Sequence, residues 1–162
     1  MRSLILTQLP NTIALCHATC GADVQELGGA LAVREAQEGL VDGSLKIIAL
    51  IVHPRALLHL PSFEEASPRL LALGWDGAQM AQALHAPSLR DEAGALRSPL
   101  EQARSLVLLT ARGCGLLAFD CAESSLDGAS LRARCHEAKA LGFDGKIATD
   151  GDQARIIEEA FA

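Results

Sequence analysis

The sequence predicts an α/β protein built around one mostly parallel β-sheet. Residues 45–52 are almost all apolar, with no alternation of polar side chains, which is typical of a central strand buried on both faces. Strand-like and helix-like segments alternate along the chain, and right-handed crossovers then place successive strands side by side. Because no linker or low-complexity stretch interrupts this pattern, we expect residues 1–162 to form a single domain.

The composition is that of an ordinary globular protein and argues against several classes of partner. Of the 162 residues, 49% are hydrophobic and 21% are charged. The net charge of −6 disfavours nucleic-acid binding, which needs a positive surface. No apolar run approaches the roughly 18 residues of a membrane span, and the N-terminus turns polar too early for a signal peptide. We expect a cytoplasmic protein without a membrane or nucleic-acid partner.

The five cysteines are an odd number and are scattered, mostly within apolar runs. This pattern favours reduced, buried thiols over a disulfide framework. The fragment Cys16-His17-x-x-Cys20 looks like half of a metal site, but the chain has no second pair of ligands to complete it. We therefore favour buried thiols over a metal site.

The N-terminal segments predict two short strands and one long helix. Residues 4–7 and 12–16 are short apolar runs that fit strands. Residues 21–38 carry apolar side chains at spacings of three and four, which predicts an amphipathic helix. Gly39 follows as its stop signal.

The central strand ends at Pro54, because proline cannot donate to a sheet ladder. The segment after it predicts two short helices. The first covers residues 54–60, and the second begins at Ser62, where we expect a capping box with Glu65. Pro68 ends the second helix, since the residue before a proline avoids helical geometry.

Residues 69–75 predict the next buried strand. Asp76 is then expected to cap a short helix, with Gln79 as its reciprocal partner and an end near Leu84. The polar residues 85–97 form a loop long enough to suggest a lid or a contact with a partner.

The strongest helix start in the chain lies at Ser98. It combines a cap residue with Pro99 at the first helical position and with Glu101 shortly after. This pattern predicts a helix over residues 98–112. The apolar residues 116–121 predict a strand after it.

The C-terminal segments complete the alternation. A turn signal at residues 126–128 opens a helix that ends near Ala140. Residues 145–149 predict the last strand. The last helix, over residues 150–161, begins with Asp150 as its cap.

No G-x-G-x-x-G follows a strand, and neither a G-x-x-x-x-G-K-[ST] loop nor a G-x-S-x-G elbow occurs. The chain therefore lacks the usual sequence signatures of dinucleotide, nucleoside triphosphate and serine-hydrolase sites.

Residues 138–148, Gln153 and residues 156–161 closely match the C-terminal end of a known family. The matching segments elsewhere are residues 13–27, 45–51 with Arg55, 66–69, 98–105 and 118–120. Together they resemble the citrate lyase beta-subunit / HpcH–HpaI aldolase family from residue 12 to residue 161.

This resemblance implies a (β/α)8 TIM-type barrel whose members form or cleave carbon–carbon bonds in oxo-acid or acyl-CoA substrates. A magnesium ion in the family orients the oxo-acid and stabilises the enolate as a Lewis acid. A complete barrel takes about 250 residues, whereas this chain offers five to six parallel strands. We therefore expect a partial barrel that corresponds to the C-terminal part of the family fold.

The resemblance also indicates that the metal ligands of the family are not retained. Val52 stands where the family has its metal glutamate, and Gln79 stands where it has its metal aspartate. Valine has no donor atom, and a neutral amide is a poor substitute for a carboxylate on magnesium. We expect no cofactor, with magnesium present only if the family activity is retained. Whether the chain is an enzyme stays open.

Four polar residues near predicted strand ends are candidate site residues. Asp76, Asp120 and His53 are candidates for catalysis, and Arg55 is a candidate for holding a substrate carboxylate through a bidentate pair. The alternatives are a helix cap for Asp76, a turn for Asp120, a solvated turn for His53 and a surface ion pair for Arg55. We favour the alternative for each residue except Asp120, for which both interpretations stay open.

The leading hypothesis is a family member with impaired or absent catalysis that binds an organic acid or acyl-CoA, or serves as a subunit. A second hypothesis is an active lyase, completed by a partner chain or by a site built from Asp76 and Asp120. A third is a non-catalytic α/β interaction module that uses residues 85–97, and a fourth is a truncated reading frame without a role of its own.

Because a partial sheet leaves open edges, we expect a homodimer or another chain that completes the barrel.

Overall fold

The computed structural model describes residues 11–121, 123 and 126–162. Its five strands form one sheet in the order β1-β2-β3-β4-β5, and every neighbouring pair is parallel. The strands are β1 (Thr12–Cys16), β2 (Lys46–Ile51), β3 (Leu70–Trp75), β4 (Leu117–Asp120) and β5 (Gly145–Lys146). Strand order that follows chain order without reversal is the arrangement of a (β/α) barrel, whereas a doubly wound sheet reverses its order.

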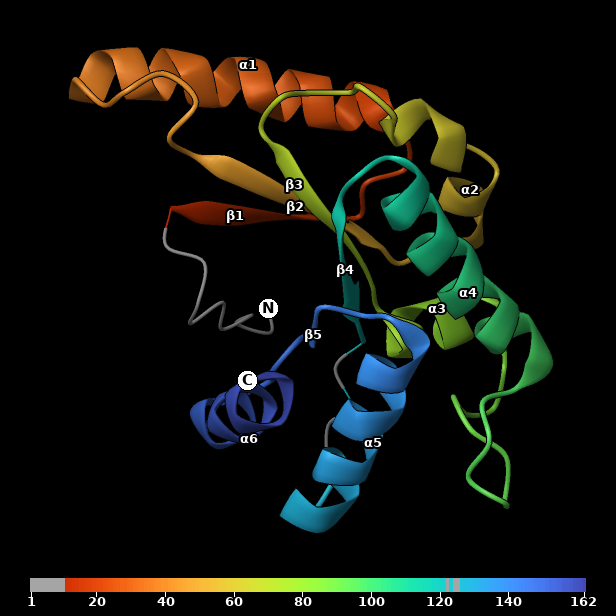
Figure 1. The fold of residues 1–162 in the computed structure, drawn as a ribbon. Coiled ribbons are helices and arrows are strands. Elements are labelled where there is room, and N and C mark those ends of the chain that lie inside the picture. Colours follow the sequence, from red (N-terminus) through yellow and green to blue (C-terminus); the bar gives the residue numbers. More distant parts are fainter. Residues whose placement is uncertain (1–10, 122, 124–125) are drawn as a thin grey trace.

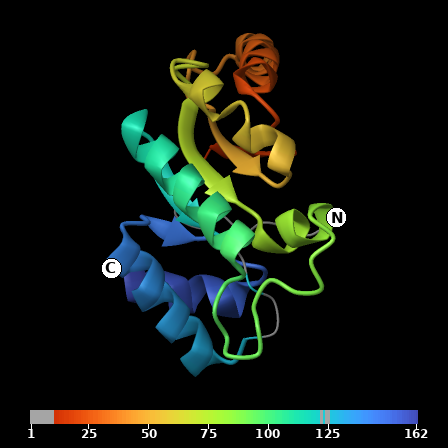
Figure 2. The same ribbon diagram turned by 90° about the vertical axis from the view of Figure 1, so that its right-hand side faces the viewer.

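Helical segments separate the strands, and one more follows β5 (Figure 1). They are α1 (Gly21–Glu38), α2 (Pro54–Leu57), the 3-10 helix η1 (Leu60–Phe63), α3 (Gly77–Ala83), α4 (Ser98–Gly113), α5 (Gly128–Leu141) and α6 (Gly151–Phe161). The last two helices, α5 and α6, pack against each other at the C-terminal end of the chain (Figures 1 and 2). None of the described helices is long and apolar enough to span a membrane.

The two faces of the sheet are buried in different ways. One face packs against helices, because Ile47, Ala49 and Ile51 of β2 share a cluster with apolar residues of α1 to α5. The other face carries what we call the inner cluster, made of strand residues and residues directly after strands. Its buried members are Ile48, Leu50, Val52, Ala72 and Ile147. Helices on one face and strand side chains alone on the other are the layers of a barrel wall.

The inner face of the sheet is curved and covered by packed side chains, as the surroundings of Gly74 show. A Cβ atom at Gly74 would lie 2.9 Å from Leu50 Cδ2 and 3.4 Å from Ile147 Cδ1. Leu50 belongs to β2 and Ile147 follows β5 directly, so side chains from strands three positions apart converge over β3. This convergence needs a sheet that bends toward its inner face, and we describe the fold as an open, partial barrel.

Most elements expected from the sequence are confirmed. The strand over 12–16 and the helix over 21–38 coincide with β1 and α1. The strand of residues 69–75 and the helices after Asp76, at Ser98 and after residues 126–128 are each present within a few residues of the expected bounds. Residues 4–7 lie outside the described part of the chain.

The prediction of a second short helix that begins at Ser62 is wrong. The 3-10 helix η1 ends at Phe63, and Glu65 has a left-handed φ of 55°, so no capping box joins Ser62 to Glu65. The Ser62 hydroxyl donates to His59 O at 2.6 Å and accepts from Gly21 N at 2.8 Å. Ser62 thus satisfies a free backbone amide at the start of α1 instead of capping a helix of its own.

Smaller corrections concern two element ends. The last strand is β5, with two residues, because the chain leaves the sheet after Lys146. The cap position of α4 is Arg97, which makes no side-chain cap bond, and Ser98 is the first helical residue. The Ser98 hydroxyl instead accepts from Gln102 Nε2 at 3.3 Å.

The cysteines are reduced, but they are less uniformly buried than the sequence suggested. All five are free thiols. Cys121 and Cys135 are buried, Cys20 and Cys114 are half-buried, and Cys16 is exposed. Cys16 is exposed because it ends β1, which pairs only with β2 among the described strands.

Candidate functional site

The parallel strands bring their carboxyl ends to one edge of the sheet, which we call the carboxyl edge. Ligand sites of (β/α) barrels are built there. Asp120 ends β4, Asp76 directly follows β3, and His53 comes two residues after β2. Arg55 lies one step further, in α2. The four candidate residues are therefore all near the carboxyl edge. They differ in the burial and the hydrogen-bond partners of their side chains.

Val52 directly follows β2 at the carboxyl edge. It is 3% exposed and belongs to the inner cluster with Ile48 and Leu50. Side chains alternate along a strand, so Val52 points to the face that encloses the interior of a barrel. The position that the family resemblance assigns to a metal glutamate therefore holds a hydrocarbon group among other hydrocarbon groups.

His53 and Arg55 form a local turn at the carboxyl edge. His53 is exposed and caps α2, because its Nδ1 accepts from Arg55 N at 3.1 Å. The Arg55 side chain is exposed as well. The pKa of Asp23 lies below its usual value, chiefly because the backbone and hydroxyl of Thr19 donate to it, with a smaller effect from the Arg55 charge. Arg55 is thus an accessible cation beside the start of α1.

Asp76 caps α3 as the sequence predicted. Its Oδ1 accepts from Gln79 N at 3.0 Å, and its Oδ2 accepts from Gln79 Nε2 at 2.9 Å. The Asp76 backbone N donates to Ile51 O at 3.0 Å. Asp76 therefore lies beside the end of β2, and its carboxylate is engaged by the helix it caps.

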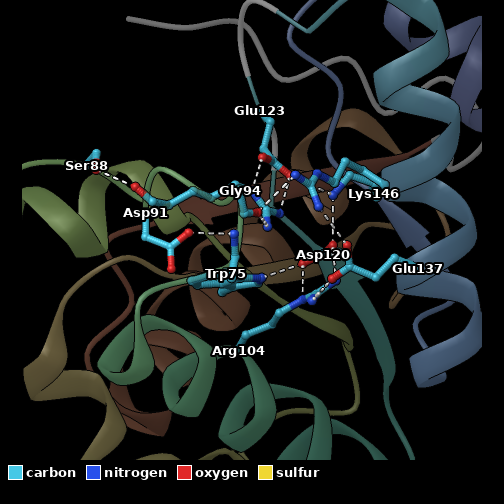
Figure 3. Close-up of polar contacts among 12 residues, drawn as sticks. Trp75, Ser88, Asp91, Gly94, Arg104, Asp120, Glu123, Glu137 and Lys146 are labelled. Carbon is cyan, nitrogen blue, oxygen red and sulfur yellow. Dashed lines mark hydrogen bonds and ion pairs between the residues drawn. The ribbon is translucent and has the colours of Figure 1, made fainter.

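Asp120 lies on the other face of the sheet, toward the helices. It is 1% exposed, and its carboxylate accepts from Trp75 Nε1 at 2.7 Å and from Lys146 Nζ at 2.8 Å. Arg104 of α4 donates to both oxygens, at 3.1 and 2.9 Å. Figure 3 shows these donors converging on the one carboxylate. The partners of Asp120 are entirely different from those of Asp76, so the structure does not bring the two carboxylates into one site.

The charges around Asp120 determine its protonation and that of its neighbours. Burial acts to raise the pKa of Asp120, but Lys146 and Arg104 outweigh it and hold that pKa below the usual value. Burial acts to lower the pKa of Lys146, and Asp120 outweighs it, so the ammonium pKa lies above the usual value. Burial, aided by the Asp120 charge, raises the pKa of Cys121 to about 12. At neutral pH Cys121 is therefore a thiol and not a nucleophilic thiolate.

Asp120 belongs to a larger chain of alternating charges whose two end arginines both donate to Gly94 O, and we call this network the ionic ring. Arg104 also pairs with Glu137, at 2.6 Å. Lys146 lies 3.7 Å from Glu123. In order, the ring comprises Arg90, Glu123, Lys146, Asp120, Arg104, Glu137 and Arg134. It joins α4, α5 and the carboxyl ends of β4 and β5 to the loop of residues 85–97 (Figure 3).

Sequence reasoning did not identify Lys146 and Arg104 as partners of Asp120. A signal was present for both. Arg104 falls on the same helical face as Leu100 and Val107, and Lys146 stands between Gly145 and Ile147 in an expected buried strand. Charged side chains at such positions are rarely buried without a partner. What the sequence could not supply was the identity of that partner.

The described residues do not fit a magnesium ion of the family type. No group of three or more His, Cys, Asp or Glu side chains in the described part of the chain is arranged to hold a metal. The carboxylate of Asp120 is surrounded by positive charge, which repels a cation. The Asp76 carboxylate is engaged by the backbone and side-chain amides of Gln79. No magnesium-dependent step is therefore derived from these residues.

Similarity to known proteins is found among solved structures. No family model matches the sequence, and no curated protein matches it. Among solved structures, the citrate lyase beta subunit of M. tuberculosis complexed with oxaloacetate and magnesium is similar, with a TM-score of 0.75 and 25% identity over 93% of this chain. This chain is citrate lyase beta subunit-like. The resemblance in its sequence is thereby confirmed, together with its partial-barrel fold.

The citrate lyase beta subunit-like chain matches only part of each such structure. It covers 61% of the oxaloacetate complex and 51% of a structure of the same protein with magnesium, acetoacetate and coenzyme A, which has a TM-score of 0.76 and 25% identity over 93% of this chain. RipC from Yersinia pestis has the same fold, with a TM-score of 0.74 and 24% identity over 96% of this chain and 65% of its own.

Proposed function

We propose that this citrate lyase beta subunit-like protein binds an organic acid or acyl-CoA at its carboxyl edge and has lost magnesium-dependent carbon–carbon cleavage. The observation that carries the proposal is the burial of Val52 in an apolar cluster. A buried valine stands at the position that the resemblance assigns to a metal glutamate, and Gln79 stands at the position of the aspartate.

The chemical reason is the charge that develops during cleavage. Carbon–carbon bond cleavage next to a carbonyl generates an enolate, and the family stabilises that enolate with a metal ion. Without groups to hold the ion, the developing charge has no Lewis acid to stabilise it. The buried cations Arg104 and Lys146 face the opposite side of the sheet and are paired with Asp120.

Ligand binding without the metal is supported by Arg55. Its guanidinium is exposed at the carboxyl edge and can pair with a carboxylate in bidentate geometry. The similar M. tuberculosis structures carry oxaloacetate, pyruvate, acetoacetate and coenzyme A. We take a small oxo-acid or its thioester as the ligand class for this chain.

A second candidate is an active lyase whose missing carboxylates come from a partner chain. Asp76 favours it, because this residue lies beside the end of β2 at the carboxyl edge and a second carboxylate close by would make a pair. In that case both magnesium binding and turnover depend on the partner.

Thermal unfolding of the full chain tests the proposal. We expect oxaloacetate or acetyl-CoA to raise the unfolding midpoint equally with and without magnesium chloride. A ligand at a hundredfold excess over its dissociation constant stabilises the native state by about 2.7 kcal/mol. The variant Arg55→Ala should lose the shift. The control Arg34→Ala removes another exposed arginine, in an ion pair with Glu38 on α1, and should keep it.

Two outcomes contradict the proposal. A shift that requires magnesium would show that the chain holds the metal and would favour the active lyase. No shift with either ligand would exclude binding at the carboxyl edge and would leave a non-catalytic interaction module.

A further inference from the structure

Residues 88–97, between α3 and α4, form a compact unit that we call the strap. Its hydrogen bonds are largely internal: Asp91 N donates to Ala95 O at 2.9 Å, and Gly94 N donates to Asp91 O at 3.1 Å. At its base, Arg97 N donates to Leu89 O at 3.3 Å. An isolated antiparallel bridge joins Arg90 to Leu96. The strap therefore carries its own backbone structure, which does not depend on the sheet.

Polar attachment of the strap to the rest of the fold runs through the ionic ring. Arg90 of the strap donates to both oxygens of Glu123, at 2.8 and 3.0 Å. Arg134 of α5 donates to Gly94 O at 3.1 Å, and the same carbonyl accepts from Arg90 Nη1 at 3.0 Å. Gly94 O is therefore the point where the ring closes (Figure 3).

Apolar packing of Leu89 and Leu96 against the core complements these two arginines. A Cβ at Gly77 would lie 2.8 Å from Leu89 Cδ1 and 3.0 Å from the Trp75 ring. Leu89 of the strap thus lies over the start of α3, next to the tryptophan that donates to Asp120. The closed strap thus lies beside Trp75, at the carboxyl end of β3.

We propose that the strap opens as a unit, releasing Arg90 from Glu123 and Gly94 from Arg134 while the sheet and helices stay folded. Opening breaks these contacts and the packing of Leu89 and Leu96 against the helix-facing core, whereas the internal hydrogen bonds move with the strap. A segment with few external contacts and its own hydrogen bonds is a low-energy unit for local opening. The motion uncovers Trp75, Glu123 and Lys146, so the strap gates access to the carboxyl edge from the helix side.

The chain provides its own reporters for this motion. Trp75 is the single tryptophan, and the chain has no tyrosine, so intrinsic fluorescence reports on the residue beneath Leu89. Arg90 and Arg97 are trypsin sites within the strap. When opening is fast relative to cleavage, the cleavage rate follows the population of the open form.

The decisive variant is Arg134→Gln, which removes the contact with Gly94 from outside the strap. Its side chain is 28% exposed, so the substitution leaves the core intact. The matched control is Arg132→Gln on the same helix, which breaks an exposed ion pair with Glu159. We expect Arg134→Gln to raise the initial trypsin cleavage rate after Arg90 and Arg97 about threefold to fivefold. Acrylamide quenching of Trp75 should rise with it.

A second variant, Glu123→Gln, removes the charge that holds Arg90 and should raise strap cleavage about tenfold or more. Equal cleavage of Arg134→Gln and Arg132→Gln would overturn the proposal. So would cleavage that rises at all trypsin sites together, or only when the circular dichroism signal melts, since either result means that the strap opens only with global unfolding. These readouts need no ligand, so they are independent of the proposed function.

Discussion

Asp120 carries a negative charge in a place where only 1% of its surface is exposed. Such burial is tolerated because Arg104, Lys146 and the Trp75 indole all donate to the carboxylate. The two cations exceed the single anion, and Glu137 and Glu123 on either side restore the balance. The residue that the sequence left undecided between a site and a turn is the centre of a buried electrostatic network.

This arrangement makes Asp120 critical for stability. Replacing Asp120 with asparagine should lower the free energy of unfolding by about 3–5 kcal/mol, because it removes the carboxylate that buried Arg104 and Lys146 share and leaves an excess of buried positive charge. Urea denaturation monitored by circular dichroism measures the change. The control Asp152→Asn removes a 94% exposed carboxylate and should change stability by less than about 0.5 kcal/mol. A loss below 1 kcal/mol for Asp120→Asn would contradict the structural role.

At the scale of elements, α1 shows how a helix is fixed at both ends. Its first residue, Gly21, lies so close to η1 that a Cβ atom there would meet Ser62 O at 1.9 Å. At its other end Glu35, 1% exposed, pairs with Arg69 at 2.7 Å. The hydrogen bond from Arg69 outweighs burial and lowers the pKa of Glu35 to about 2. The helix is thus tied to the start of β3 by charge and to η1 by close approach.

Two glycines of α1 give a paired prediction. Gly21→Ala should destabilise the protein by about 1–3 kcal/mol, because the new methyl group collides with the backbone of η1. Gly29→Ala meets no atom within 4 Å and should stabilise the protein by about 0.5–1 kcal/mol, because alanine favours a helix interior. Chemical denaturation of both variants measures the difference. Equal effects would mean that α1 approaches η1 less closely than described.

At the scale of the whole molecule, the described sheet ends at β1 and β5 instead of closing. In the described residues, β1 pairs with β2 alone and β5 with β4 alone. Large apolar side chains also stand on the surface, among them Val41 at 78%, Leu58 at 79% and Leu109 at 67% exposure. Open edges and exposed apolar groups favour association with another chain.

We therefore expect the purified chain to be a homodimer or a larger assembly. Sedimentation velocity at protein concentrations from about 1 to 50 μM tests this expectation, since an interface of typical size holds at micromolar concentration. A single monomeric species over the whole range would contradict it. The chain would then need a different partner to cover its edges, or none.

Particular elements show how far sequence reasoning reached. The apolar run of residues 45–52 predicted β2, and helical spacing predicted α1, because both depend on local periodicity. Asp76 was recognised as a cap from its spacing to Gln79. Ser62 was misassigned, since its hydroxyl satisfies an amide 41 residues away, at Gly21. Local patterns identify caps of the same helix, but they do not reveal a cap that comes from another element.

The sequence by itself determined the order and type of the elements, the resemblance to the citrate lyase beta subunit, and the absence of carboxylates at Val52 and Gln79. Only the tertiary structure decided which face each strand-end residue occupies. It placed Asp120 against Arg104 and Lys146 and separated it from Asp76. It also joined the strap to the ionic ring. The physical reason is that charge pairing joins residues distant in the chain, whereas periodicity and capping act between neighbours.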